Sequence, residues 1–212
     1  MREPINVSGM VLSASPVGEY DKRVVILTRE LGKITAFARG ARRMKSPLMA
    51  VSNPFVFGEF QVYEGRDSYT LSGANIKEYF LDLAQMQPGV YYGFYFLELA
   101  EYFGQEGNDE TQMLNLLYVT MNAIRRGKQD LRLIRCIFEL RTITISGEAP
   151  QMFSCMECGT KENLTVFSLR DSAIYCPNCG KTIRDPWPLQ PGTVLACRYI
   201  IAAPLAKLYG FT

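Results

Sequence analysis

The segment Phe55-Val56-Phe57-Gly58-Glu59-Phe60-Gln61-Val62-Tyr63 contains the clearest strand signal in this chain. Glu59 and Gln61 alternate with Phe60 and Val62, which is the period of a strand with one face toward a core and the other toward water. Turn signals bound the segment on both sides, since Asn-Pro precedes it and Glu-Gly-Arg-Asp follows it. We therefore predict a strand in a β-rich region.

Strand patterns continue on both sides of this segment within residues 1–80. β-Branched and apolar residues favour strands at 7–11, 24–28, 34–38 and 69–72, and turn signals separate them. Five short strands in such a region suit a small closed barrel. An open meander of the same strands is the competing interpretation.

From residue 81 the apolar period changes from that of a strand to that of a helix. Helices are predicted over 88–104, 109–126 and 130–146, and a last helical region over 191–209 is expected to be interrupted near Pro204. The chain is thus predicted to be an α+β protein with several domains.

Composition excludes several classes of protein. The chain has 212 residues, a net charge of +2 and no histidine. Without histidine there is no Ser-His-Asp or Cys-His pair, and a catalytic zinc site is not expected either, so we predict that the protein is not an enzyme. No run reaches the roughly 18 apolar residues of a membrane span. The start lacks an apolar secretory region, so we expect a cytoplasmic protein.

Four cysteines form the strongest motif, in the pairs Cys155-Met156-Glu157-Cys158 and Cys176-Pro177-Asn178-Cys179. Two residues between the members of a pair let both thiolates reach one ion at about 2.3 Å, and the separation of the pairs is that of a zinc ribbon. Between the pairs, residues 164–168 and 173–175 are predicted to form a hairpin. Four sulfur ligands fill a tetrahedron, so one structural Zn²⁺ is predicted. Redox chemistry, or two unrelated pairs, is the alternative.

Other residues in and near this motif lead to two further predictions. Gly159 and Gly180 each follow the second cysteine of a pair, where a positive φ would turn backbone amides toward the sulfurs. Cys136 and Cys197 lie within helical patterns outside the motif and are expected to be small buried hydrophobic residues.

A basic segment, Arg39-Gly40-Ala41-Arg42-Arg43-Met44-Lys45-Ser46-Pro47, lies between two predicted barrel strands. It has four positive charges and no negative one, and such a loop at a barrel rim can follow a phosphate backbone. Nucleic-acid binding is one interpretation, which the barrel favours because five-stranded barrels commonly bind single strands. A solvated surface loop is the other.

A second basic set belongs to the predicted helices. Its members are Arg125, Arg126, Lys128, Arg132, Arg135 and Arg141. Arg132 and Arg135 share a helix face, and Glu139 follows Arg135 at a spacing of four, which allows an ion pair. From the residues alone, an exposed helix face with internal pairing is slightly favoured.

These features, in this order, resemble the bacterial recombination mediator family RecO. The resemblance rests on Val7-x-Gly9-x-Val11-Leu12, on Leu27-Thr28-Arg29-Glu30-x-Gly32-Lys33, on Ala38-Arg39-Gly40-Ala41-Arg42-Arg43-x-Lys45-Ser46 and on the late Cys-Pro-Asn-Cys-Gly. It covers nearly the whole chain, and the second and third segments together make it specific. Members of that family run further, through a last helix, so a chain that stops at 208–212 is expected to be truncated.

The resemblance implies a fold and a function. The fold is a five-stranded OB-fold barrel over 1–80, then a helical domain over 81–150 and 186–212 with a four-cysteine zinc ribbon inserted at 151–185. The function is that of a mediator in RecF-pathway DNA repair, which binds single- and double-stranded DNA, anneals complementary strands and helps to load RecA onto strands coated by single-stranded-DNA-binding protein. RecR and the acidic C-terminal tail of the coating protein are the implied partners, RecA is reached indirectly, and the location is the bacterial cytoplasm, at the nucleoid during repair.

The resemblance also implies site residues. DNA is expected to contact Arg39, Arg42, Arg43 and Lys45, with Lys33 as a further candidate. The tail of the coating protein ends in an apolar residue with a free carboxylate, which arginine can bind bidentately. We expect the helical domain to receive this tail near residues 91–103, with Arg132 as the first candidate among Arg125, Arg126, Arg132 and Arg135.

Two other classes of function compete with this one. A zinc-ribbon transcription or translation factor would bind a polymerase or ribosome, but the basic segment belongs to the barrel and the cysteine region is balanced in charge. A nucleic-acid-modifying enzyme would need catalytic groups, and the chain has neither a phosphate-binding Gly-x-x-x-x-Gly-Lys-Ser/Thr loop nor a paired-carboxylate motif.

Overall fold

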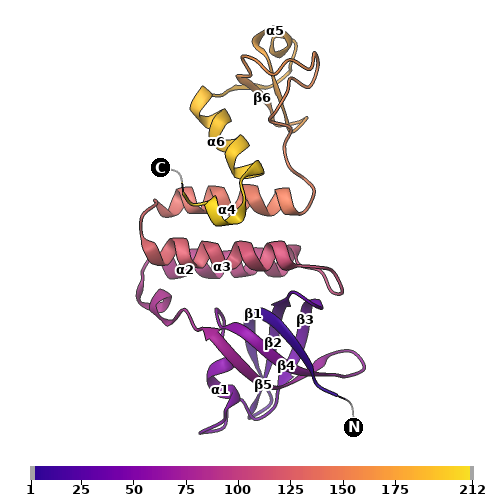
Figure 1. Ribbon diagram of the computed structural model, residues 1–212, viewed down its shortest axis with the longest axis vertical. Coiled ribbons are helices and arrows are strands. Elements are labelled where there is room, and N and C mark those ends of the chain that lie inside the picture. Colours follow the sequence, from indigo (N-terminus) through magenta and orange to yellow (C-terminus); the bar gives the residue numbers. More distant parts are fainter. Residues whose placement is uncertain (1–2, 211–212) are drawn as a thin grey trace. The chain divides into compact units, whose positions relative to one another are not determined.

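The computed structural model describes residues 3–210 of the chain (Figure 1). The chain divides into two compact units, Met1–Arg135 and Cys136–Thr212, and we describe each by itself. Among the described residues, no helix combines the length and the apolar character that crossing a membrane requires. The expected truncation concerns residues 208–212, of which 211 and 212 lie outside the described residues.

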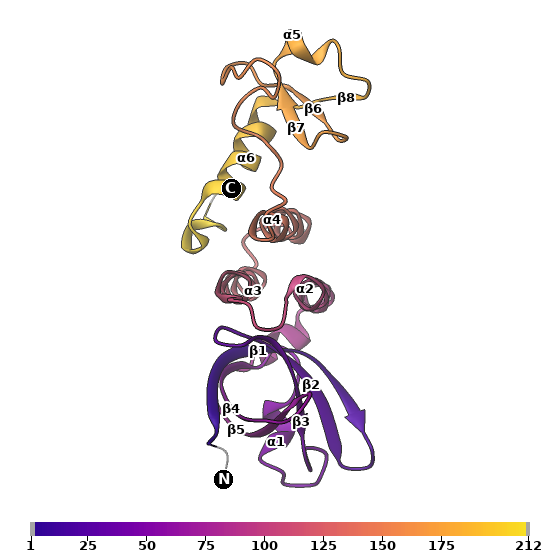
Figure 2. The same ribbon diagram turned by 90° about the vertical axis from the view of Figure 1, so that its right-hand side faces the viewer.

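The first unit begins with a closed barrel. Its strands are β1 (Ile5–Val17), β2 (Asp21–Thr28), β3 (Gly32–Ala38), β4 (Phe57–Glu64) and β5 (Tyr69–Glu78). The order around the barrel is β1-β2-β3-β5-β4, and β4 pairs with β1 to close the ring that Figure 2 shows. β3 and β5 are parallel, and the other neighbours are antiparallel. The predicted OB-fold barrel is confirmed, and the open meander is wrong.

Two glycines, Gly9 and Gly58, lie where β1 pairs with both of its neighbouring strands. Gly9 faces both Gly58 of β4 and Thr28 of β2. A Cβ at Gly9 would lie 2.5 Å from the carbonyl oxygen of Leu27, and one at Gly58 would lie 2.5 Å from that of Asn75. Because real side chains cannot approach so closely, glycine is required at both positions.

Alternate residues of the strands fill the barrel. Those with side chains inside include Val7, Val24, Ile26, Ile34, Ala36, Phe60, Val62 and Leu71, all buried. A short helix, α1 (Leu48–Val51), adds Leu48 and Val51 to this core. The inward residues of β3 are therefore the even-numbered ones, which leaves the odd-numbered ones on its outer face.

Helices follow the barrel close to their predicted bounds. A 3₁₀ turn, η1 (Leu81–Gln85), leads to α2 (Gly89–Phe103), α3 (Thr111–Arg126) and α4 (Leu131–Ile145). α3 ends at Gly127, whose φ of 60° is in the left-handed region that terminates helices. α4 begins in the first unit and ends in the second.

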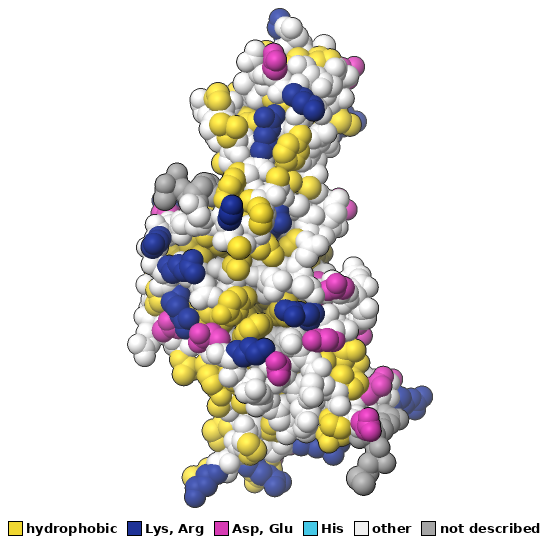
Figure 3. All heavy atoms as spheres, viewed as in Figure 1, with side chains coloured by type: hydrophobic (Ala, Val, Ile, Leu, Met, Phe, Trp, Pro, Cys, Tyr) yellow, Lys and Arg dark blue, Asp and Glu magenta, His cyan; other side chains and the backbone are white. Residues whose placement is uncertain are grey.

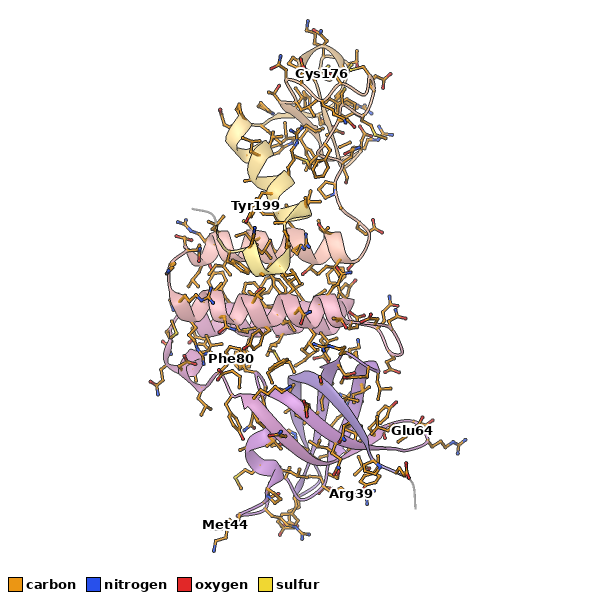
Figure 4. The ribbon with its side chains drawn as sticks, viewed as in Figure 1. Arg39, Met44, Glu64, Phe80, Cys176 and Tyr199 are labelled. Carbon is orange, nitrogen blue, oxygen red and sulfur yellow. The ribbon has the colours of Figure 1, made fainter. Side chains whose placement is uncertain are left out.

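Aromatic side chains join the barrel to α2 and α3. Phe55 packs against Gly93 of α2, where a Cβ would lie only 2.9 Å from the phenyl ring. The ring of Tyr118 of α3 lies 4.8 Å from that of Phe57 and 5.8 Å from that of Phe80, measured between centroids. Figure 4 shows Phe80 between the barrel and these helices. The barrel and the two helices thus share one apolar interface.

The β2–β3 turn makes a second attachment, through its backbone. Gly32 has a φ of +68°, and a Cβ there would lie 2.3 Å from the carbonyl oxygen of Gln105 in the loop after α2. The backbone N–H of Lys33 donates to that oxygen at 2.8 Å. The Lys33 ammonium group donates to the carbonyl oxygen of Glu101 at 2.6 Å, near the C-terminal end of α2, where the helix dipole favours a cation.

The second unit contains a small sheet and short helices. Its elements after α4 are β6 (Val166–Ser168), β7 (Ala173–Tyr175), α5 (Pro177–Gly180), β8 (Pro186–Pro188), α6 (Pro191–Ala202) and η2 (Leu205–Lys207). The sheet order is β7-β6-β8, and β6 and β7 form the predicted hairpin. Ile174, Leu164 and Val194 belong to the core of this unit. The Arg198 Nε–H of α6 donates to the carbonyl oxygen of Met152 at 2.7 Å, so α6 is tied to the start of the cysteine region.

The expectation for the two remaining cysteines is wrong for Cys136. Cys136 is exposed on α4, and Cys197 of α6 is half-buried. The buried side of α4 contains Ile134, Ile137 and Phe138. A residue two positions after Ile134 lies about half a turn around the helix from it, so position 136 faces away from that side.

We expect Gly32→Ala to lower the free energy of unfolding by at least about 2 kcal/mol. A non-glycine residue at positive φ costs about 1–3 kcal/mol, and here the added Cβ also meets a backbone oxygen that cannot rotate away. Denaturant unfolding followed by circular dichroism measures the change. Gly73→Ala in β5 is the matched control, since nothing lies within 4 Å of a Cβ at that position. Equal losses in the two variants would show that the contact with Gln105 does not stabilise the fold.

Candidate functional site

Four thiols converge in the second unit, and Figure 4 labels one of them. They are Cys155, Cys158, Cys176 and Cys179, whose sulfur atoms all lie within 4.8 Å of one another. The first pair precedes β6, and the second pair begins directly after β7 and continues into α5. The hairpin returns the chain to the first pair, and the backbone N–H of Met156 donates to the carbonyl oxygen of Ile174 in β7 at 3.0 Å.

The sulfur spacing fits a metal ion better than a disulfide. The sulfur atoms of Cys158 and Cys176 are 3.8 Å apart. A disulfide bond needs about 2.05 Å, whereas the edge of a sulfur tetrahedron with metal–sulfur bonds of about 2.3 Å is about 3.8 Å long. The four cysteines could therefore hold one ion, and four protein ligands would leave no position for water or a substrate.

Backbone amides stabilise the thiolate forms that bind metal. Burial raises the pKa of Cys155, but hydrogen bonds from the backbone N–H groups of Cys158, Cys176 and Glu157 outweigh it and lower this pKa to about 6. The backbone N–H of Cys179 is the main cause that lowers the pKa of Cys176. The pKa of Cys179 itself is raised to about 12, chiefly by its hydrogen bond with the Cys176 side chain, a contact that a bound ion would replace. Since the thiolate is the metal ligand, the lowered pKa values of Cys155 and Cys176 favour metal binding at these two sulfurs.

The two glycines of the motif have different roles. Gly159 has the predicted positive φ, +72°, and its N–H donates to the carbonyl oxygen of Cys155 at 2.9 Å. The same prediction is wrong for Gly180, which is the last residue of α5 and donates to the carbonyl oxygen of Cys176 at 2.8 Å. Glycine is required there for space, because a Cβ would lie 2.8 Å from a methyl group of Val166.

The basic segment forms a loop whose backbone is fixed to the β1–β2 turn. The backbone N–H of Gly40 donates to the carboxylate of Asp21 at 2.7 Å. The Arg43 guanidinium lies over the ring of Tyr20, 4.9 Å from its centroid. Figure 4 places Arg39 and Met44 at the end of the barrel that is away from α2 and α3. The loop is thus a defined structure rather than a loose linker.

Its four predicted DNA contacts point to solvent. Arg39, Arg42, Arg43 and Lys45 are all exposed, and Figure 3 shows Lys and Arg side chains gathered at this end of the barrel. The pKa of nearby Lys22 is lowered, first by burial and then by the charge of Arg42, so the local potential is positive. The fifth candidate, Lys33, is not part of this loop, because it is half-buried against α2.

A groove of 580 Å³ lies on the outer face of β2 and β3, beside the β4–β5 loop that follows Glu64, the last residue of β4 (Figure 4). Phe37 of β3, Arg23 of β2 and Tyr69 at the start of β5 line it. Its charged residues are Arg23, Lys33 and Arg66 against Glu64, Asp67 and Glu106. The pKa of Tyr69 is raised, first by burial and then by the charges of Glu64 and Glu106.

The sequence analysis missed three of the groove residues. Phe37 could have been found from the strand period, because it alternates with the inward-facing Ala36 and Ala38 and therefore lies on the outer face of β3. Arg23 required the strand pairing, which places it opposite Phe37. Tyr69 required the barrel closure, because it reaches the groove through the parallel pairing of β5 with β3.

The four predicted partner-binding arginines have different surroundings. Arg125 is half-buried, pairs with Glu78 at 3.1 Å and with Asp82 at 2.5 Å, and lies over the ring of Phe80. Its hydrogen bonds are the largest cause that lowers the pKa of both carboxyl groups. Arg125 therefore fastens the end of β5 and η1 to α3.

The other three arginines are exposed. Arg132 pairs with Asp130 at 3.2 Å and lines a pocket of 550 Å³ that also includes Tyr92. Arg135 lies over the ring of Tyr95 at 5.6 Å and lines a second pocket, of 280 Å³, with three tyrosines of α2, Tyr91, Tyr92 and Tyr95. The structure thus brings Arg132 and Arg135 beside the aromatic surface of α2, as predicted for residues 91–103. Arg126 lines neither of these two pockets.

Comparison with known proteins gives matches along nearly the whole chain. Residues 1–80 match the family described as "Recombination protein O N terminal", and residues 89–212 match "Recombination protein O C terminal". The DNA repair protein RecO of Alkaliphilus metalliredigens is 33% identical over 205 residues, which cover 96% of this chain and 83% of that protein. The proteins of the same name from Bacillus pumilus and Bacillus subtilis are 31% and 28% identical; the matches cover 96% and 94% of this chain, and 79% and 78% of those proteins.

The purified protein is expected to contain about one metal ion per chain, measured by elemental analysis. Cys155→Ser should release the ion and lower the melting temperature, because a structural site contributes directly to folding stability. Cys197→Ser, outside the four-sulfur group, should retain both. Since protons compete with the ion for thiolates, metal should be retained at neutral pH and released in acid. The backbone amides that lower the pKa of Cys155 to about 6 favour retention. A metal-free wild-type protein would contradict this prediction.

Proposed function

The chain belongs to the recombination protein O (RecO) family of DNA repair proteins, and on that basis we propose that it is a recombination mediator that binds DNA through its barrel. In this role it binds single- and double-stranded DNA and anneals complementary strands. It also helps to load RecA onto strands coated by single-stranded-DNA-binding protein, together with RecR. It performs no bond chemistry of its own, so binding and positioning account for its activity.

The observation that supports this proposal most directly is the exposed basic loop at one end of an OB-fold barrel. Four cations without an intervening anion suit a phosphate backbone. The loop is held by Asp21 and Tyr20, so little entropy is lost when DNA binds. We assign the phosphate contacts to Arg39, Arg42, Arg43 and Lys45. Lys33 is a weaker candidate, because its ammonium group already has a partner on α2.

The ion at the four cysteines is Zn²⁺ in this proposal. A tetrahedral set of four sulfur ligands suits zinc or an iron–sulfur cluster, and a single ion is consistent with the 3.8 Å separation of two of the sulfurs. The ion is structural and holds the turn before β6 to the end of β7. The elemental analysis described above distinguishes zinc from iron.

The partner surface in this proposal is the aromatic face of α2 with Arg132 and Arg135. The acidic tail of the coating protein presents a free carboxylate next to an apolar side chain, which matches an arginine beside a tyrosine-lined pocket. Arg125 is less suited to this role than predicted, since Glu78 and Asp82 already occupy its guanidinium.

We expect the triple variant Arg39→Ala, Arg42→Ala, Arg43→Ala to bind single-stranded oligonucleotides more weakly than the wild type. Each lost phosphate contact should reduce the slope of log affinity against log salt concentration by about 0.7. Fluorescence anisotropy at several salt concentrations measures both quantities. Annealing of complementary oligonucleotides without nucleoside triphosphate should slow in parallel.

A charge-matched control for this variant removes three exposed cations from the second unit, at Lys161, Arg170 and Arg184. It should keep the wild-type slope. If the loop variant keeps wild-type affinity and slope, the loop is not the DNA site. If the wild-type protein fails to anneal strands, both bare and coated, the mediator function is rejected.

Arg132→Ala and Arg135→Ala should each weaken binding of a labelled peptide with the sequence of the coating protein's tail, by roughly tenfold or more, since a charge-assisted hydrogen bond is lost. Affinity for naked DNA should stay nearly unchanged. Lys128→Ala, an exposed cation close in sequence, is the control and should bind the peptide normally. Equal loss of peptide and DNA binding would indicate a general anion-binding surface instead.

A further inference from the structure

The basic loop and the groove beside it differ in charge, since the loop is purely cationic and the groove is balanced. The loop, residues 39–47, has no anion, whereas the groove is lined by Glu64, Asp67 and Glu106 as well as by cations. Burial raises the pKa of Tyr69, and the charges of Glu64 and Glu106 raise it further. A phosphate that entered the groove would meet three carboxylates as well as three cations, so the groove suits the DNA backbone less than the loop does.

The groove instead offers an aromatic side chain with a guanidinium group beside it. Phe37 lines the groove from the outer face of β3. The basic loop begins at Arg39, two residues further along the chain and just after the end of β3. Arg23 lies opposite Phe37 on β2, and its Nη2 donates to the hydroxyl of Thr35 at 3.4 Å, which holds the guanidinium along the strand. A nucleic-acid base has a π face that can stack on such a side chain, whatever its sequence.

We propose that Phe37 is the residue through which this protein distinguishes unpaired from paired DNA. The phosphates of either form follow the basic loop, and a base of an unpaired strand turns into the groove and stacks on Phe37. A duplex keeps its bases paired inside the helix, so none is available to stack on Phe37 and paired DNA contacts the loop alone. This inference rests on the proposed function, since it takes the loop to be the phosphate-binding surface.

The test compares Phe37→Leu with the wild type, using an oligothymidine and a blunt duplex of equal length. Leucine keeps an apolar side chain on β3 but removes the π face. We expect affinity for the oligothymidine to fall about fivefold or more, the lower end of what base–aromatic stacking contributes, and duplex affinity to change by less than about twofold. Phe37→Trp, which restores an aromatic face, should recover the single-strand affinity.

The ratio of the two affinities decides the outcome, because a partly unfolded variant would lower both equally and leave the ratio unchanged. Tyr79→Leu, an exposed aromatic outside the groove, should leave the ratio at its wild-type value. An unchanged ratio for Phe37→Leu, with duplex affinity at its wild-type value, overturns the role of Phe37. Failure of the proposed function gives a different result, in which the triple variant of the basic loop binds both DNA forms as the wild type does.

Discussion

The backbone contact between the β2–β3 turn and the loop after α2 holds the first unit together. The N–H of Lys33 donates to Gln105 and the N–H of Gly107 donates to Leu31, so turn and loop pair as a short antiparallel bridge. This contact requires glycine at position 32, where a Cβ would overlap the backbone of the loop. With the turn held in this way, the aromatic residues around the barrel can pack against α2 and α3 in one arrangement. The opposite end of the barrel, away from these helices (Figure 4), presents the basic loop.

Electrostatics divides the exposed surface of the barrel into two neighbouring regions. The charge of Arg42 lowers the pKa of Lys22 after burial does, whereas carboxylates beside Tyr69 raise its pKa after burial does. A net charge of +2 for the whole chain hides this contrast between a loop without anions and a groove that contains three. In the function proposed above, the loop would bind phosphates and the groove would bind bases.

The four-cysteine module depends on short-range geometry. Backbone amides of the two cysteine pairs lower the pKa of Cys155 and Cys176. The β6–β7 hairpin brings the two pairs close enough to bind one ion. Because Gly180 has no side chain, α5, which contains Cys179, can pack closely against Val166 of β6. The cysteine spacing therefore predicts the ligands of the module, but it does not predict the packing of Gly180 against Val166.

The period of two in the β strands, the period of the helices and the spacing of the cysteines are local properties of the chain. They were enough to predict the strands, the bounds of α2, α3 and α4 to within two residues and the four-sulfur cluster, because each shows in a local period or spacing. They left a closed barrel and an open meander as alternatives, since closure depends on the long-range pairing of β1 with β4. The long-range contacts were not predictable in this way. The pairing of β2 with β3 places Arg23 opposite Phe37, and the fold of η1 onto α3 gives Arg125 two carboxylate partners. Such neighbours are set by tertiary packing, which also decides the exposure of Cys136, because burial depends on which side of a helix the rest of the protein covers.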